Sequence, residues 1–155
     1  MGHGLDRLNG FFYINKSIKS IPSVFKKVNS VMKHEETTEQ IIKAFYKVYN
    51  TLGYGFLEKV YENALYIELT NMNFNVQKQQ PIKVFYEEDE VGLYFADLIV
   101  NNLIIIELKA TESIANEHYI QLVNYLKATN MEVGLLLNFG KKPEVKRKIF
   151  DNDYK

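Results

Sequence analysis

The chain has 155 residues, with 46% hydrophobic side chains, no cysteine and a formal net charge of zero at neutral pH. A chain of this length and apolar content can form one domain with a sizeable core, and its 11 tyrosines and 10 phenylalanines argue against disorder. Without cysteine there is neither a disulfide framework nor a thiolate zinc site, and the zero net charge excludes the bulk basicity of many nucleic-acid-binding proteins.

The first 31 residues differ from the rest of the chain. They contain five basic residues and one acidic residue, and their apolar residues show only weak periodicity. We interpret residues 1–31 as an N-terminal extension, expected to be poorly ordered or dispensable, and residues 32–155 as the folded domain. The alternative is a basic arm that follows the phosphate backbone of a nucleic acid.

Hydrophobic periodicity predicts, in chain order, helices, antiparallel strands, a helix and a final strand. Apolar residues recur at helical spacing in three segments: 35–50, 57–71 and 114–127. Five segments have the composition of β-strands: 75–78, 82–87, 91–100, 103–110 and 133–139. Lys141, Lys142 and Pro143 end the last strand, before a short charged C-terminal segment. This order predicts an α/β (α+β) domain with a mixed central β-sheet flanked by helices.

The strand predicted over residues 103–110 carries charged side chains in an otherwise apolar run. Because side chains alternate along a strand, Glu107 and Lys109 point to the same side. Ionised groups are rarely buried unless they are paired or bind a metal ion. A buried salt bridge is therefore one explanation of this pair, and a functional site is the other.

A second acidic residue, Asp97, lies on the preceding predicted strand, before a turn at Asn101 and Asn102. A two-residue turn would leave Asp97 on the wrong face, whereas a three-residue loop or one bulge would place it opposite Glu107. Two opposed carboxylates repel each other unless a cation lies between them. Oxygen ligands without a nearby histidine or cysteine favour Mg²⁺ or Mn²⁺ over Zn²⁺. The alternative is that Asp97 is an ordinary hairpin acid near the solvent end of its strand.

Asp97 and the Glu-Leu-Lys sequence at residues 107–109 resemble the D…(E/D)-x-K signature of the PD-(D/E)XK nuclease superfamily. Upstream, residues 55–61 read Gly-Phe-Leu-Glu-Lys-Val-Tyr, which resembles the G-x-x-E-x-x-Y motif of the GxxExxY family within that superfamily. The resemblance extends from about residue 32 to residue 150. The chain departs from the pattern at Ala96, where the superfamily name has a proline that is not a metal ligand.

This resemblance implies a role for each motif residue. Asp97 and Glu107 would bind Mg²⁺ or Mn²⁺, and the backbone carbonyl of Leu108 would complete the protein ligands. Glu58, the acidic residue of the G-x-x-E-x-x-Y motif, would be an active-site acid that reaches the metal ion, as in the family, often through water. Lys109 would lie beside the attacking water, where it either lowers the pKa of that water or stabilises the developing negative charge. Without the resemblance, Glu58 is explained as a first-turn acid favoured by the helix dipole.

The resemblance also implies residues near the nucleic acid. Superfamily members often have a glutamine or a lysine at the position of Gln121, which we count among the catalytic residues. Some have a Q-x-x-x-Y pair like Gln121 and Tyr125 that touches the site or the nucleic-acid backbone. Tyr61 and Tyr125 are candidate nucleic-acid contacts, and for both the alternative is a core aromatic residue. Lys141 and Lys142 belong to a basic cluster that is either a solvated end of the chain or a phosphate clamp.

The function predicted from these residues is Mg²⁺-dependent hydrolysis of phosphodiester bonds in DNA or RNA by a cytoplasmic nuclease. A second hypothesis is a catalytically inactive nucleic-acid-binding or assembly module that kept the nuclease fold, and a third is hydrolysis of a small phosphoester. No apolar run in the sequence approaches the roughly 20 residues of a membrane span, so we expect no membrane partner. A homodimer is left open.

Overall fold

The computed structural model describes residues 33–155, so the extension predicted for residues 1–31 lies outside the described residues. The elements follow one another as α2 (Glu35–Leu52), α3 (Glu58–Asn71), β1 (Val76–Tyr86), β2 (Asp89–Val100), β3 (Ile104–Lys109), α4 (Asn116–Ala128), β4 (Val133–Phe139), β5 (Pro143–Ile149) and a short 3₁₀ helix, η2 (Asn152–Tyr154). The three helices predicted from periodicity are confirmed. Within residues 33–155, no helix is both long and apolar enough to cross a membrane.

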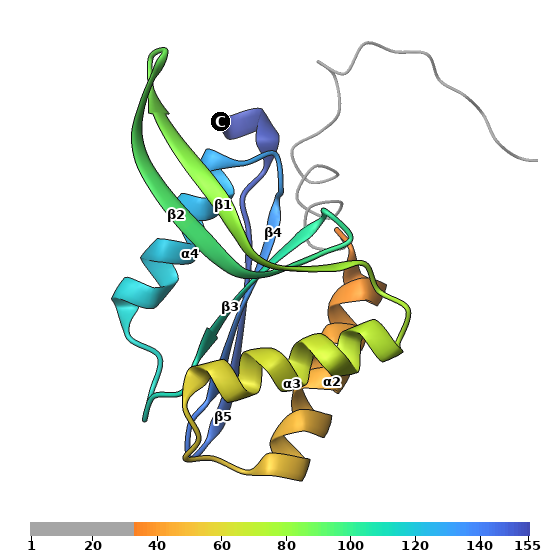
Figure 1. Ribbon diagram of the computed structural model, residues 1–155. Helices are drawn as coiled ribbons and strands as arrows, with labels where there is room; N and C mark the ends of the chain where they lie inside the picture. Colours follow the sequence, from red (N-terminus) through yellow and green to blue (C-terminus); the bar gives the residue numbers. More distant parts are fainter. Residues whose placement is uncertain (1–32) are drawn as a thin grey trace, which may run out of the picture.

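The five strands form one sheet in the order β1-β2-β3-β4-β5 (Figure 1). Strands β3 and β4 pair in parallel, whereas the other neighbours pair antiparallel. A parallel pair needs a crossover connection, and α4 supplies it between β3 and β4. The predicted mixed sheet flanked by helices is therefore confirmed.

Side chains from the two faces of the sheet pack into two hydrophobic cores. The even-numbered residues of β3 pack in the core that contains the apolar residues of α2 and α3. On the opposite face, Ile105 packs in a second core with Leu122 of α4. Strand β3 therefore contributes to both cores, which explains its near-continuous apolar run. By the same alternation, Glu107 and Lys109 belong to the face that α4 covers.

The long β1–β2 hairpin passes from one face of the sheet to the other. Leu98 packs in the core of α2 and α3, whereas Ala96, two residues away, packs in the core of α4. Residues two apart on a regular strand share a face, so the hairpin twists at Asp97. On β1 the facing residue is Gln79, whose φ of 50° is a left-handed value that few non-glycine residues adopt. Figure 1 shows the resulting bend, at which the hairpin turns away from α3 and rises past α4.

Two details of the strand prediction are wrong. The separate strands predicted at 75–78 and 82–87 are parts of the single strand β1. Pro81 and the left-handed Gln79 interrupt its alternation, and an edge strand such as β1 tolerates a proline. The short charged segment expected after the last predicted strand contains a further strand, β5. It is the opposite edge strand, and charged residues, common on edges, hide its pattern in the sequence.

Candidate active site

The pairing between β2 and β3 ends where the charged residues begin. A three-residue loop, 101–103, joins the two strands, and their last paired residues are Leu98 and Ile106. Continuing this register by one residue places Asp97 opposite Glu107, as predicted for a three-residue loop. The local turn geometry therefore decides that the two acidic residues face each other.

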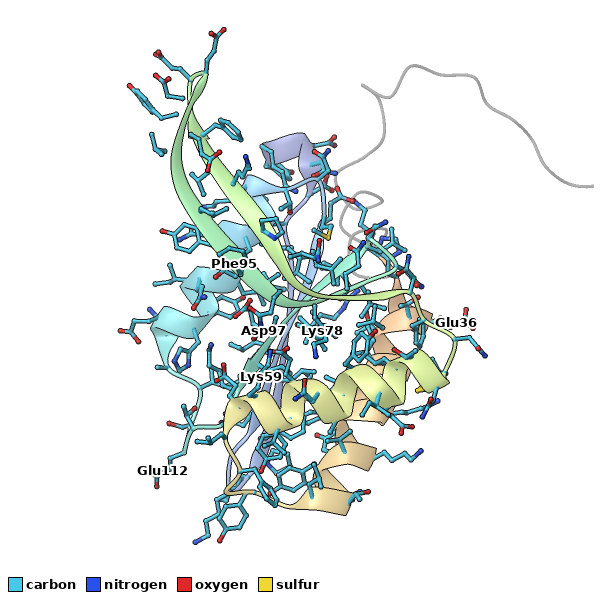
Figure 2. All side chains as sticks on the ribbon, viewed as in Figure 1. Glu36, Lys59, Lys78, Phe95, Asp97 and Glu112 are labelled. Carbon is cyan, nitrogen blue, oxygen red and sulfur yellow. The ribbon has the colours of Figure 1, made fainter. Side chains whose placement is uncertain are left out.

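The carboxylate of Asp97 takes the place of a strand partner at this point. Asp97 Oδ2 accepts a hydrogen bond of 2.8 Å from the backbone N–H of Leu108. Strands β2 and β3 can separate here because this amide remains satisfied. Burial raises the pKa of Asp97, whereas the Leu108 N–H and the positive charge of Lys109 oppose the shift. Figure 2 shows Asp97 between the hairpin and the first part of α3, which carries Lys59.

Glu107 is an almost completely buried acid with incomplete hydrogen bonding. Its exposed fraction is 2%, and its Oε2 lies 3.8 Å from the Nζ atom of Lys109. Among residues 33–155, no group donates a hydrogen bond to Glu107 Oε1, although this atom is buried. Burial, followed by the charge of Asp97, raises the pKa of Glu107 to about 8, and Lys109 acts in the opposite direction. A buried and unpartnered carboxylate oxygen is costly unless something else binds it.

The pair formed by Asp97 and Glu107 has the chemistry of a divalent cation site. Within residues 33–155, no three acidic or histidine side chains already converge as a metal-binding group. Mg²⁺ does not require such a cage, since it is usually bound by one or two carboxylates and keeps several water molecules. The free Oε1 of Glu107 beside Asp97 therefore fits a hydrated Mg²⁺ or Mn²⁺ better than a fully protein-bound zinc ion.

The loop before α3 places Glu58 within electrostatic range of the two acids. Gly53 and Gly55 have φ values of 70° and 108°, a region in which glycine is far less strained than other residues. Helix α3 begins directly afterwards, at Glu58. Burial raises the pKa of Glu58, Lys109 lowers it, and Asp97 raises it further. Glu58 in turn contributes to the raised pKa of Glu107, so the three acids and Lys109 form one electrostatic cluster.

Tyr61 holds this loop from inside the core. Its side chain has an exposed fraction of 0%, and its ring stacks on Phe139 with a centroid distance of 4.3 Å. The Tyr61 hydroxyl donates a hydrogen bond of 2.8 Å to the carbonyl of Gly53 and accepts one of 3.2 Å from the N–H of Phe56. Of the two alternatives for Tyr61, the structure shows a core aromatic residue. Its burial leaves no surface for direct contact with a nucleic acid.

Replacing Tyr61 with phenylalanine is expected to lower the free energy of unfolding by about 1–3 kcal/mol, because the Gly53 carbonyl and the Phe56 N–H lose their partner. Any cleavage activity should fall as well, since the loop that positions Glu58 is released. Urea denaturation and a cleavage assay measure the two effects. The matched control is Tyr54→Phe, because Tyr54 is an exposed tyrosine of the same loop. Equal stability of the two variants would contradict this role of Tyr61.

A polar network that sequence reasoning missed connects Asp97 to α3. The Gln79 side-chain amide donates to Glu62 Oε2 at 2.8 Å and to Asp97 Oδ1 at 3.3 Å. Glu62 is buried, and its other oxygen accepts from Lys59 Nζ at 2.6 Å. The only sequence signal for Glu62 is its position four residues after Glu58, on the same face of the helix. Nothing in the sequence marks Gln79, because its role depends on the twist of the hairpin.

Helix α4 places Gln121 and Tyr125 on the other side of the acidic cluster. The Gln121 side-chain amide donates a hydrogen bond of 2.5 Å to the Tyr125 hydroxyl. Tyr125 is buried, and burial raises its pKa, with further contributions from the charges of Glu107 and Asp97. Tyr125 therefore lies within electrostatic range of the acids, and Gln121 is hydrogen-bonded to it, so the two predicted residues form a pair beside the site.

Lys141 and Lys142 lie in the turn between β4 and β5 and are exposed. In the parallel β3–β4 pair, Lys109 faces Asn138, so this turn is at the same end of the sheet as Lys109. The backbone carbonyl of Lys141 accepts a hydrogen bond of 2.9 Å from the Tyr49 hydroxyl, which fixes the turn on α2. The two exposed lysines therefore lie at the end of the sheet that carries the acids.

Comparison with known proteins identifies the class of this domain. Residues 35–148 match the family model of the PD-(D/E)XK nuclease superfamily, and the chain belongs to this superfamily. Its members generally use divalent metal ions. No curated protein matches the chain. Among solved structures, the protein SSO0001 is similar over 79% of this chain and 62% of its own, with 21% sequence identity and a TM-score of 0.45, a likeness too distant to bear on function.

Proposed function

We propose that this protein is a divalent-metal-dependent nuclease of the GxxExxY type that hydrolyses phosphodiester bonds in DNA or RNA. The observation that carries the proposal is the buried, unpartnered Oε1 of Glu107 beside Asp97, on a strand that also presents Lys109. Membership of a nuclease superfamily supports a nucleic acid as the substrate. A salt bridge that served only stability would leave neither the free oxygen nor the second carboxylate explained.

In this proposal, Asp97, Glu107 and the backbone carbonyl of Leu108 hold Mg²⁺ or Mn²⁺, and Glu58 contributes through a water molecule. The bound ion would act as a Lewis acid and lower the pKa of an attacking water. The hydrogen bond from the Leu108 N–H to Asp97 supports these roles, because it fixes one ligand relative to the strand that carries the other.

Lys109 and Gln121 serve the reacting phosphate in this proposal. The ammonium group of Lys109 is largely buried beside Glu107, where it can stabilise the negative charge that develops on the phosphate oxygens. Gln121 is oriented by its hydrogen bond to Tyr125, so its amide can help to place the substrate. The exposed Lys141 and Lys142 would contact the phosphate backbone farther from the reacting bond.

Incubation of the full chain with labelled single- and double-stranded DNA and RNA in the presence of Mn²⁺ tests the proposal. The Glu107→Gln variant should cleave at least about 100-fold more slowly than the wild type, because one charged ligand is lost while the shape of the side chain is kept. Glu112→Gln is the matched control, since Glu112 is exposed in the loop after β3 (Figure 2). Equal cleavage by Glu107→Gln would refute the site, and no cleavage by any preparation would favour the inactive binding module.

Two expectations from the sequence stay predictions beside this proposal. One is a cytoplasmic location, which cell fractionation tests. The other is a homodimer, which the mass of the protein in solution tests.

A further inference from the structure

A groove runs between the β1–β2 hairpin and α4. The bend of the hairpin at Asp97 carries its outer half past this helix (Figure 1). The groove lined by side chains of the two elements has a volume of about 980 Å³. The side chains that matter for its chemistry are Lys83, Phe85, Tyr94, Gln121, Tyr125 and Lys127. We propose that this groove holds unpaired bases of a single-stranded nucleic acid and leads the strand to the acidic site, an inference that rests on the proposed nuclease function.

The inner end of the groove is continuous with the candidate site. Gln121 and Tyr125 line the groove, and they also flank the acidic cluster. The ring of Tyr94 lies 5.8 Å from the ring of Tyr125, and Tyr94 is three residues before Asp97 on β2. A nucleic-acid strand that follows the groove inward therefore arrives beside Asp97 and Gln121, where one of its phosphates would react.

The walls of the groove suit bases better than backbone phosphates. Tyr94 and Phe85 are half exposed or more, so their rings are available to a ligand. Gly92 leaves space beside the Tyr94 ring, because a β-carbon at this position would approach the ring to 3.3 Å. Exposed aromatic rings that follow one another along a path are the stacking platforms of proteins that bind single strands. A base in a duplex is already stacked on its neighbours, so a groove of this kind selects unpaired nucleotides.

The described residues that line the groove carry a small excess of positive charge, and the hairpin turn beyond its outer end carries four acids, residues 87–90. Among the described residues that line it there are two lysines, Lys83 and Lys127, and one acid, Glu117. Lys83 pairs with Glu90 at 2.9 Å, but both side chains are well exposed, and such pairs are weak enough to be exchanged for a phosphate. Between Gln121 and Lys127 the helix rises by about 9 Å at about 1.5 Å per residue. That length limits the part of the single strand beside α4 to a few nucleotides.

Strand β2 provides a matched pair of variants for the test. Tyr94 and Phe95 are adjacent, each with an exposed fraction of 50%, and the alternation of the strand points them to opposite faces. Tyr94 lines the groove, whereas Phe95 is not among its described lining residues. Fluorescence anisotropy with a labelled single strand and a duplex of the same sequence, in Ca²⁺ to prevent turnover, measures the affinity of each variant.

Tyr94→Ala and Phe85→Ala should each weaken single-strand binding at least about fivefold, since each stacked base contributes a factor of this size or more. Tyr94→Phe, which keeps the ring, and Phe95→Ala should bind like the wild type, and duplex binding should not depend on Tyr94. Hydrolysis of the small diester bis(4-nitrophenyl) phosphate should be unchanged in Tyr94→Ala, because this substrate has no strand to occupy the groove.

The outcomes separate the groove from the nuclease. Tyr94-dependent binding without any Glu107-dependent cleavage would support the groove and refute the nuclease. Glu107-dependent cleavage with equal single-strand affinity in Tyr94→Ala, Phe85→Ala and Phe95→Ala would refute the groove alone. A dimer in solution that Tyr94→Ala dissociates would also overturn the inference, because a second copy of the chain would then fill the groove.

Discussion

Loss of the Asp97 charge is expected to abolish both Mg²⁺ binding and cleavage. Mg²⁺ binds weakly to protein sites and depends on one or two carboxylates, so Glu107 and a backbone carbonyl would not suffice. The preferred variant is Asp97→Asn, because the amide oxygen can still accept the hydrogen bond from the Leu108 N–H and the fold is maintained. Alanine would leave this amide unsatisfied, at a cost of about 1–3 kcal/mol.

Calorimetric titration with Mg²⁺ and a cleavage assay on the same preparation measure this prediction. Asp89→Asn is the matched control, since Asp89 is an exposed aspartate at the other end of the same strand. An Asp97→Asn protein that cleaves at the wild-type rate would exclude this aspartate from the site.

Lys109→Ala should lose turnover but keep metal binding, unlike Asp97→Asn. Its charge matters mainly when the transition state forms, so metal and substrate binding should persist while turnover falls by about 10²–10⁴-fold. Single-turnover kinetics at saturating enzyme separates the two effects. The control is Lys43→Ala, because Lys43 is exposed on α2. Near wild-type turnover without Lys109 would refute its assigned role.

The second large effect is expected in the stability of the metal-free protein, which should depend strongly on pH. Burial, followed by the charge of Asp97, raises the pKa of Glu107 from its ordinary 4.5 to about 8. Between these two values the folded protein keeps a proton that the unfolded chain has released. The unfolded state therefore binds fewer protons, and the free energy of unfolding falls as the pH rises through this window. At about 1.4 kcal/mol per pKa unit, the loss is on the order of 4–5 kcal/mol.

Glu107→Gln should remove most of this pH dependence, because a glutamine has no proton to lose. The metal-free variant should be as stable as the wild type near pH 5 and more stable above about pH 8. Denaturation in EDTA across this range measures the effect, and Glu112→Gln should keep the wild-type slope. A loss of more than about 2 kcal/mol at neutral pH would point instead to a structural salt bridge with Lys109.

Much of the site could be predicted from the sequence because strand geometry is local. Alternation along a single buried strand places Glu107 and Lys109 on one side, and the loop at residues 101–103 sets the register that brings Asp97 opposite. The glycines before α3 similarly mark the tight entry that presents Glu58. Each of these features depends on residues that are close in the sequence, so the pattern of residue types is sufficient to predict it.

Other features were decided only by the tertiary structure. Gln79 contacts both Glu62 and Asp97 across 17 and 18 residues of sequence, and this depends on a twist that strand alternation does not contain. The choice between surface and core for Tyr61 depended on Phe139 and on the loop carbonyl that its hydroxyl reaches. The groove over α4 exists because the hairpin changes faces at Asp97. Local periodicity determines to which side of a strand a residue points, but only packing between distant segments determines which residues it contacts.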